Sequence, residues 1–351
     1  MPDVLADLNP AQRHAAEEVS GPVCILAGAG SGKTTTITRR IANQVRAGAF
    51  EARHILAVTF TDKAAGELAS RLERLGAPGV TARTFHATAL RQLSALSDRP
   101  ISVIPSKYAL LRDVCRGLPS GLRDRPLGDI ASEIERAKNA RVDPGRYLDW
   151  LANSEPPLPA ELMHGVYDGY ERAKERLAKF DFEDLLERLI RVYESDRHAL
   201  ERFKRGCHSI TVDEYQDVNL LQQTLLERWL DGRDELCAVG DDYQSIYGFT
   251  GASPRWLLGM RERYPHAAVI TLEENYRSTP QVLALANRLV PKLAGAPKKL
   301  RPTRPAGPKP LIRSFDGAEA ETAFLATEIQ RLKASGVRYD EIGRASCRER
   351  V

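Results

Sequence analysis

The sequence has few cysteines, no long apolar run and no targeting signal at its start, and these absences narrow the class of protein. Its 351 residues include five cysteines, which lie far apart without any Cys-x-x-Cys spacing. That distribution argues against a zinc site or a disulfide framework and is typical of the reducing cytoplasm. No apolar run approaches the ~20 residues that cross a membrane, and residues 1–12 lack the basic start and apolar stretch of a signal peptide. We therefore expect a cytoplasmic, globular protein with no membrane partner.

Charge and composition permit several functions and single out none. Hydrophobic residues make up 42% of the chain, enough to bury proper cores, and the formal net charge is +4. A mild basic excess is compatible with nucleic acid as a partner, but many enzymes share it. The function must therefore be sought in the motifs.

Short β-branched runs alternate with helical segments over much of the chain. The expected strands cover residues 23–26, 55–59, 210–212, 236–239 and 269–272. Gly48 and Gly76 are placed to end the helices that follow the first two strands, and Thr61 or Asp62 can cap the second of these helices. Strands that alternate with helices predict a parallel α/β sheet.

Between about residues 90 and 195 helical periodicity replaces this alternation. Apolar residues recur at helical spacing, for example at Leu162, Val166, Tyr170 and Leu177. We interpret the region as an all-helical insertion into the α/β domain.

A glycine-rich loop joins the first expected strand to a helix. Its residues are Ala27, Gly28, Ala29, Gly30, Ser31, Gly32, Lys33 and Thr34. Glycines let backbone N–H groups curl around phosphates, and a helix N-terminus adds partial positive charge. In such loops the lysine reaches the β- and γ-phosphates and the next hydroxyl ligates Mg²⁺, so Lys33 and Thr34 are candidates to bind ATP and Mg²⁺. The general pattern begins with Gly where this chain has Ala27; a purely structural glycine turn is the alternative, and the strand–loop–helix setting disfavours it.

Polar and aromatic residues follow two later strands. Asp213 comes directly after the strand at 210–212 and is placed to hold Mg²⁺, and Glu214 is placed to polarise the attacking water. Gln244 is a candidate γ-phosphate sensor, and Tyr247 and Phe249 can stack on bases. Taken singly, neighbouring carboxylates are commonly solvated charge, and such aromatics are more often core residues than base platforms.

Eight short motifs occur in order along nearly the whole chain. They are LNPAQ at 8–12, AGAGSGKT at 27–34, VTFTDKAA at 58–65, TFH at 84–86, FDFEDL at 180–185, DEYQD at 213–217, GDDYQSIYGF at 240–249 and ENYRST at 274–279. Together they resemble the UvrD/Rep/PcrA family of superfamily-1 DNA helicases. Residues 84–93 and 249–258 look most like one branch of it, the second UvrD-type helicase of actinobacteria. Two positions depart from the family pattern: Thr35 stands where many relatives have Arg, and Thr250 stands where many have Arg after an aromatic residue.

The resemblance implies a role for each matching residue. Gln12 is expected to read the adenine edge, Tyr276 to stack on that base, and Arg277 to reach the γ-phosphate from a second motor domain. The residues implied to line the single-stranded DNA path are Phe60, Thr84, His86, Phe182, Tyr247 and Phe249. The implied activity is that of an ATP-dependent 3′–5′ DNA helicase or translocase in repair or replication. ATP and Mg²⁺ are its expected cofactors, and single-stranded DNA and single/double-strand junctions are its expected partners.

The fold class that the resemblance implies is α/β, with a RecA-like P-loop NTPase motor domain built on a parallel sheet. We expect this domain to comprise residues 1–90 and 191–272, with an all-helical subdomain at 91–190 and an incomplete second RecA-like domain at 273–340. Residues 341–351 break the family pattern, and we expect them to be a non-native tail. Because the last family motifs are absent, we expect the chain as written to bind nucleotide weakly and to unwind nothing.

Two other functions stay open at this point. One is the motor part of a helicase–nuclease of the RecB/AddA sort. The other is a DNA-binding accessory protein that uses ATP only as a switch, although the intact Lys33, Glu214 and Arg277 count against it because a switch can dispense with the base. Protein partners are not indicated.

Overall fold

The structure is a computed structural model that describes residues 3–123, 125–152, 154–293 and 295–343. The chain divides into two units, Met1–Ala306 and Gly307–Val351, which are described separately below. Most of the tail expected at residues 341–351 lies outside the described residues.

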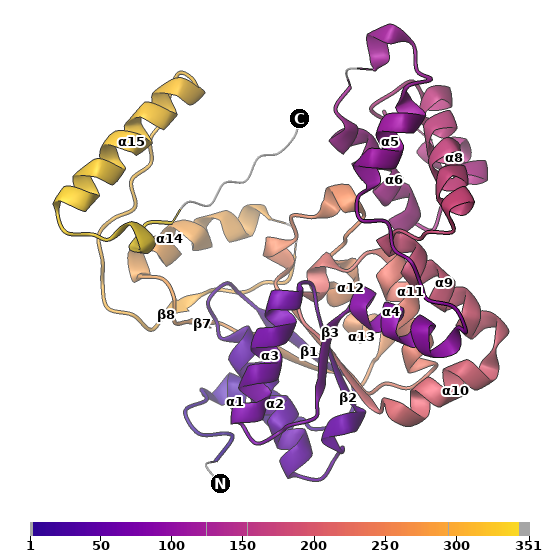
Figure 1. Ribbon diagram of the computed structural model, residues 1–351. Coiled ribbons are helices and arrows are strands. Elements are labelled where there is room, and N and C mark those ends of the chain that lie inside the picture. The colour runs from indigo at the N-terminus through magenta and orange to yellow at the C-terminus, as the bar shows by residue number, and fades with distance from the viewer. Residues whose placement is uncertain (1–2, 124, 153, 294, 344–351) are drawn as a thin grey trace. The chain divides into compact units, whose positions relative to one another are not determined.

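A six-stranded parallel sheet forms the centre of the first unit (Figure 1). Its strands are β1 (Val23–Ala27), β2 (Ile55–Thr59), β3 (Thr81–Thr84), β4 (Ser209–Val212), β5 (Leu236–Gly240) and β6 (Ala268–Leu272). Their order is β3-β2-β4-β5-β1-β6, and every neighbouring pair runs parallel. The predicted parallel α/β fold is thus confirmed. The sequence predicts five of these strands but not β3, because β3 lies at the sheet edge and has no apolar run.

Helices cover both faces of the sheet, as the colours and labels of Figure 1 show. One face carries α1 (Pro10–Glu17), α2 (Lys33–Arg46) and α3 (Asp62–Arg74). The other carries α4 (Phe85–Leu96), α9 (Phe182–Ser195), α10 (Arg197–Gly206) and α11 (Leu220–Leu230). Alternate strand residues face the two layers: Ile25 packs with Ile37, whereas Cys24 and Leu26 belong to the opposite core with Trp229. Strands buried on both faces read as unbroken apolar runs, which is why the sequence revealed them.

A second hydrophobic core belongs to the helical insertion. Its helices are α5 (Lys107–Cys115), α6 (Leu127–Asn139), α7 (Tyr147–Leu151) and α8 (Ala160–Leu177). Val166 and Tyr170 are buried in this core, as their spacing predicts, whereas Leu177 is 52% exposed and lies off the buried face. The buried side chains of α4 and α9 pack in the hydrophobic core of the sheet and not in the core of the helical insertion. The domain borders at about 90 and 190 stay a prediction.

The remaining elements follow β5 and β6. They are α12 (Arg255–Leu258), α13 (Met260–Arg263), the short parallel pair β7 (Glu274–Asn275) and β8 (Arg301–Pro302), α14 (Pro280–Leu289), and, in the second unit, α15 (Ala318–Ala334). Across the described ranges, no helix combines the length and the apolar character that a membrane crossing requires.

Candidate nucleotide and nucleic-acid sites

The topology brings the predicted site residues to one edge of the sheet. All six strands are parallel, so their carboxyl ends lie at the same edge, where α/β proteins commonly bind ligands. The glycine-rich loop follows β1, Phe60 follows β2, Thr84 ends β3, Asp213 follows β4 and Gln244 lies beyond β5. Residues that are far apart in the sequence therefore meet at this edge.

The glycine-rich loop has the backbone shape of a phosphate cradle. Gly30 and Gly32 have left-handed backbone angles, with φ of +71° and +84°, and the Ser31 N–H and hydroxyl both donate to the Gly28 carbonyl, at 3.2 and 2.7 Å. Helix α2 begins at Lys33 with no side-chain cap and no acidic residue in its first turn. Its first N–H groups are thus left for an anion, and the helix dipole favours one.

Replacing Gly32 by Ala in the natural gene product should strongly weaken nucleotide binding, because two effects combine. The left-handed backbone costs a residue with a side chain roughly 1–2 kcal/mol, and the added Cβ would lie 2.5 Å from Gln12 Nε2. Gly48→Ala is the matched control, because Gly48 has φ of +71° but no atom within 4 Å of an added Cβ. Titration with a fluorescent ATP analogue should show the loss in Gly32→Ala alone. Equal affinities in the two variants would contradict the cradle.

The Gln12 side chain joins the start of α1 to the loop. Asn9 caps α1 and forms a capping box with Gln12, whose Nε2 also donates to the Ser31 carbonyl at 2.9 Å. One hydrogen on Nε2 and one lone pair on Oε1 remain for a ligand. Asn9 Nδ2 donates to the Tyr276 hydroxyl at 2.9 Å, and that hydroxyl donates to Glu274 at 2.8 Å. The structure therefore brings Gln12 and Tyr276 to the same side of the loop.

The segment after β6 closes against the glycine-rich loop. Asn275 is buried, donates to the Ala29 carbonyl and accepts from the N–H groups of Arg277 and Ser278. The Tyr276 N–H donates to the Gly30 carbonyl at 2.9 Å. Arg277 Cβ lies 2.6 Å from where a Cβ on Gly30 would be, so only glycine fits there, and the exposed Arg277 lies beside the loop.

The acidic residues after β4 meet the loop lysine. Lys33 Nζ lies 2.7 Å from Glu214 Oε2, which also accepts from Gln216 Nε2 at 2.9 Å. Glu214 has a left-handed backbone, with φ of +51°, a conformation that costs of order 1–3 kcal/mol and clusters at functional sites. Burial and the Glu214 charge raise the pKa of Asp213 and of Asp217 to about 6. Asp217 Oδ1 is buried without a hydrogen-bond partner among the described residues.

These side chains fit a nucleotide with a divalent cation. Three carboxylates, those of Asp213, Glu214 and Asp217, gather near Lys33. Burial, and after it the Glu214 charge, makes the ionised forms of Asp213 and Asp217 costly, and a hard cation with oxygen ligands offsets such a cost. The uncapped α2 and the left-handed glycines offer donors to phosphates on the other side.

Gln244 is held by a buried charge cluster that the sequence motifs do not reveal. Its Nε2 donates to Asp241 Oδ2. Asp241 Oδ1 also contacts Lys298 Nζ at 2.7 Å, and Lys298, 5% exposed, pairs with Asp242 as well. No local pattern marks Lys298, because its partners lie far away in the chain. Asn9 and Asn275, also unassigned from sequence, do lie inside recognisable motifs, and the Asn-Pro-Ala-Gln capping pattern of Asn9 was detectable.

The aromatic residues predicted to contact DNA form two pairs. The rings of His86 and Phe182 meet edge to face at 5.5 Å, and those of Tyr247 and Phe249 are tilted at 6.1 Å. Phe182, Tyr247 and Phe249 are 53%, 44% and 62% exposed, so their rings are accessible to a ligand. No ring contact joins the two pairs within the part of the chain that the structure describes.

Phe60 and Thr84 are less accessible. Phe60 is half-buried against the core of the sheet, and the Thr84 hydroxyl caps α4 by accepting from the Ala87 N–H at 3.1 Å. Thr84 is 8% exposed, so the structure gives it a capping contact and little free surface.

Stability should depend on His86 in mildly acidic solution. Burial, with a smaller contribution from Lys107, lowers the pKa of His86 from 6.5 to about 4. The His86 imidazole therefore binds a proton more readily in the unfolded chain than in the folded one. The contribution of neutral His86 to the free energy of unfolding is complete above pH 6.5 and is lost as the pH falls through 4. We expect His86→Gln to remove up to about 3 kcal/mol of this pH dependence. Urea unfolding of both proteins at several pH values measures it; parallel pH profiles would contradict it.

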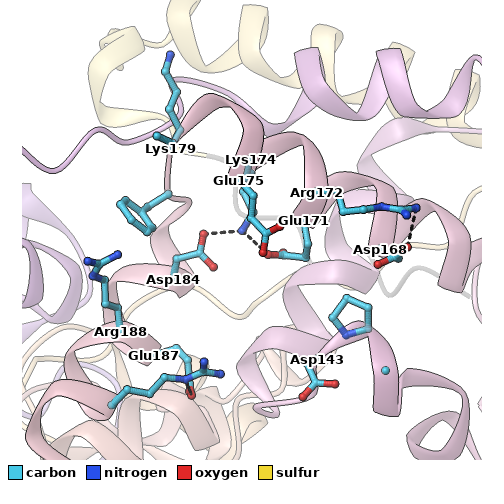
Figure 2. A pocket seen from close by; sticks show the side chains of 15 residues that line it. Asp143, Asp168, Glu171, Arg172, Lys174, Glu175, Lys179, Asp184, Glu187 and Arg188 are labelled. Carbon is cyan, nitrogen blue, oxygen red and sulfur yellow. Dashed lines mark hydrogen bonds and ion pairs between the residues drawn. The ribbon is translucent and has the colours of Figure 1, made fainter. Parts of the chain in front are cut away.

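A pocket of about 800 Å³ lies beside α8 and α9 (Figure 2). None of the predicted nucleotide-binding residues lines it. Some of its charged groups pair with one another, as Lys174 does with Glu171 and Arg172 with Asp168.

A parallel sheet with a phosphate loop after its first strand and an acidic pair at the same edge is the architecture of a P-loop NTPase. Residues 8–265 match the UvrD/REP helicase N-terminal domain, and residues 270–343 match the UvrD-like helicase C-terminal domain. The chain belongs to the UvrD/REP helicase family.

Similar proteins carry related names. ATP-dependent DNA helicase UvrD2 of Mycobacterium tuberculosis is 42% identical over 361 residues, which cover 97% of this chain and 52% of the relative. UvrD1 of the same species is 36% identical, covering 97% of this chain and 46% of the relative, and PcrA of Bacillus subtilis is 33% identical, covering 95% and 46%. The chain spans about half the length of the curated relatives it matches.

Proposed function

We propose that this chain is the ATP-binding motor part of a DNA helicase that hydrolyses ATP and moves 3′–5′ along single-stranded DNA in repair or replication. One arrangement carries the proposal: the loop lysine Lys33 meets Glu214 at the sheet edge beyond which the exposed rings of Tyr247 and Phe249 lie. A phosphate site beside a base-stacking surface is what a DNA-dependent ATPase needs. The relatives named ATP-dependent DNA helicases support the same activity. The direction of movement rests on the family resemblance.

The proposed division of labour begins with nucleotide binding. Gln12 would bind the adenine edge and Tyr276 its face. The loop N–H groups and Lys33 would hold the phosphates. Thr34 and Asp213 would hold Mg²⁺, which neutralises phosphate charge when bound. We propose residues 1–90 and 191–272 as the first motor domain, 91–190 as its helical insertion and 273–340 as part of a second motor domain.

Glu214 is proposed as the general base. Phosphate oxygens compete with the Glu214 carboxylate for Lys33, so nucleotide binding would free this carboxylate to accept a proton from the attacking water. Arg277 beside Gly30 would stabilise charge on the γ-phosphate, and Gln244 would sense that phosphate.

Nucleic acid would bind by stacking rather than by reading base edges. Phe182, Tyr247 and Phe249 offer exposed rings, and a base on such a ring gains about 1–3 kcal/mol whatever its sequence. Sequence tolerance is what a protein that steps along DNA requires.

The test is ATP hydrolysis by the natural gene product with and without an oligo(dT) strand. The proposal expects turnover that rises strongly with the strand and a strand-displacement assay that favours substrates with a 3′ overhang. Turnover that is indifferent to DNA would overturn the motor and favour an ATP-switched DNA-binding protein. Preference for a 5′ overhang would overturn the direction alone.

A further inference from the structure

The two aromatic pairs of the proposed DNA path come from different parts of the fold. Phe182 is the first residue of α9, whereas Tyr247 and Phe249 lie around the short 3₁₀ turn Gly248–Thr250 after β5. If one DNA strand stacks a base on each pair, the distance between the two pairs has to match the spacing of the bases along the strand, so this distance has to be held constant. The end of α6 contacts both the turn after β5 and the start of α9.

Asn139, the last residue of α6, holds the turn that carries Phe249. Its Nδ2 donates to the Thr250 carbonyl at 2.8 Å, and its Cβ lies 3.7 Å from where a Cβ on Gly251 would be. Asn139 is 8% exposed, so water does not easily replace this bond. Within the turn, the Thr250 N–H and hydroxyl donate to the Tyr247 carbonyl at 2.9 and 2.8 Å, and the Gly251 N–H donates to the Gly248 carbonyl at 3.0 Å. The Asn139 bond ties this turn to α6.

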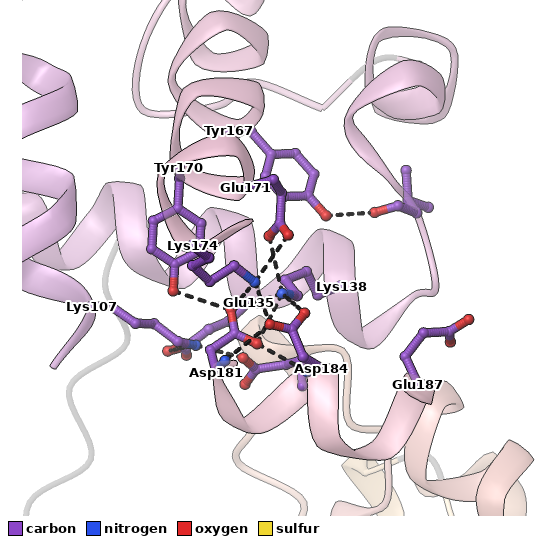
Figure 3. Close-up of polar contacts among 12 residues, drawn as sticks. Lys107, Glu135, Lys138, Tyr167, Tyr170, Glu171, Lys174, Asp181, Asp184 and Glu187 are labelled. Atoms are coloured by element: carbon purple, nitrogen blue, oxygen red, sulfur yellow. Dashed lines mark hydrogen bonds and ion pairs between the residues drawn. The ribbon is translucent and has the colours of Figure 1, made fainter. Parts of the chain in front are cut away.

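Lys138, the preceding residue, holds the start of α9. Its Nζ contacts Asp181 Oδ2 at 2.7 Å and Asp184 at 2.5 Å, and these two carboxylates flank Phe182 in the sequence. Figure 3 shows Lys138 and Lys174 converging on Asp181 and Asp184 from α6 and α8. Lys138 is 9% exposed, and its partners raise its pKa well above the usual value although burial opposes this.

We propose that the end of α6 is a brace that sets the spacing of the two base-stacking groups, with Asn139 as the positioning residue for Tyr247 and Phe249 and Lys138 as that for Phe182. The inference rests on the proposed function, because the rings matter in this way only if single-stranded DNA binds them. Neither residue needs to touch DNA. Asn139 acts through the backbone of the turn that carries Phe249, and Lys138 acts through the carboxylates on either side of Phe182.

A double-mutant cycle tests the Asn139 half of the brace. Affinity for fluorescein-labelled oligo(dT) is measured by anisotropy for the wild type, Asn139→Ala, Phe249→Ala and the double variant. Phe249→Ala should weaken binding about 5- to 150-fold, the equivalent of one stacked base. Asn139→Ala should weaken binding several-fold, and the double variant should lose clearly less affinity than the two single losses combined, because only the effect of Asn139 on Tyr247 remains once Phe249 is gone. Additive losses would overturn the brace, because they mean that Asn139 acts independently of Phe249.

Asn43→Ala is the matched control. Asn43 is 9% exposed, and its Nδ2 also donates to a backbone carbonyl, that of Ala16, at 2.9 Å, but it contacts neither ring pair. It should lose comparable stability and keep the oligo(dT) affinity. A loss of affinity as large as that of Asn139→Ala would overturn the positioning role.

Hydrogen exchange without DNA separates this inference from the proposed function. Asn139→Ala should speed amide exchange at residues 250–251, and Asn43→Ala should not. Unchanged exchange at these amides would overturn the brace whatever the DNA result. Faster exchange in a protein that never binds oligo(dT) would leave the brace as a feature of the fold and overturn both the proposed function and the role of the brace in DNA binding.

Discussion

Replacing Glu214 by Gln should lower ATP hydrolysis by the natural gene product about 10²- to 10⁴-fold, the usual contribution of a general base. The amide cannot accept the proton of the attacking water. It nevertheless has nearly the same shape and still fits beside Gln216, so folding and DNA binding should survive. DNA-stimulated phosphate release measures the loss.

Binding of ATP by this variant should become tighter, not weaker. Without nucleotide, Lys33 pairs with Glu214 at 2.7 Å, and the phosphate of ATP has to displace Glu214 from Lys33. An uncharged Gln releases the ammonium at lower cost. A fluorescent ATP analogue should therefore bind with a lower Kd to Glu214→Gln, whereas Lys33→Met should lose most binding.

Glu201→Gln provides the matched control for Glu214→Gln. Glu201 pairs with Lys204 at 3.1 Å and its side chain is 41% exposed, close to the 39% of Glu214, but it lies on α10 away from the loop. Hydrolysis by this variant should match that of the wild type. A Glu214→Gln protein that keeps a third or more of wild-type turnover would show that another group activates the water.

Much of this site was predictable because its residues are local in the sequence. The phosphate loop depends on glycines next to Lys33, and the acidic pair depends on a carboxylate directly after a buried strand. Both signals need only short-range order and the rule that parallel strands end at one edge. The strands β1, β2, β4 and β5, which are buried throughout, were predictable for a similar reason, since apolar and β-branched residues follow one another in each of them.

The rest depends on contacts that no local pattern encodes. β3 has a polar sequence and becomes a strand only because β2 offers it an edge. Lys298 is buried between Asp241 and Asp242, and Asn139 meets Thr250, across long stretches of chain. The same residue types are usually solvated, so only the packed fold distinguishes these from surface charges and amides.

Replacing Asp181 by Ala should destabilise the helical insertion by about 3–5 kcal/mol, the loss typical of breaking a buried ion pair from one side. Asp181 is fully buried and accepts from Lys138, Lys174 and the Tyr170 hydroxyl, and it also caps α9 (Figure 3). Without it, two buried ammonium groups lose a shared counter-ion. Urea unfolding followed by far-UV circular dichroism measures the change.

The pH dependence of this loss identifies the charge as its cause. Burial alone would raise the pKa of Asp181, but Lys138, Lys174 and Lys107 outweigh it and lower that pKa well below the usual 3.8. A lowered folded-state pKa gives stabilisation that is complete above the unfolded pKa near 4 and is lost at lower pH. The difference between wild type and Asp181→Ala should therefore stay constant from about pH 8 to 5 and shrink below about pH 4.

Asp168→Ala is the control for Asp181→Ala, because it removes a carboxylate from an exposed ion pair instead of a buried one. Asp168 pairs with Arg172 at 2.7 Å on the surface of α8, with side chains 38% and 67% exposed, so its loss should cost under about 1 kcal/mol. If Asp181→Ala were no more costly than Asp168→Ala, the lysines around Asp181 would have to be satisfied by their other carboxylates. Lys138 would then hold the start of α9 through Asp184 rather than through Asp181.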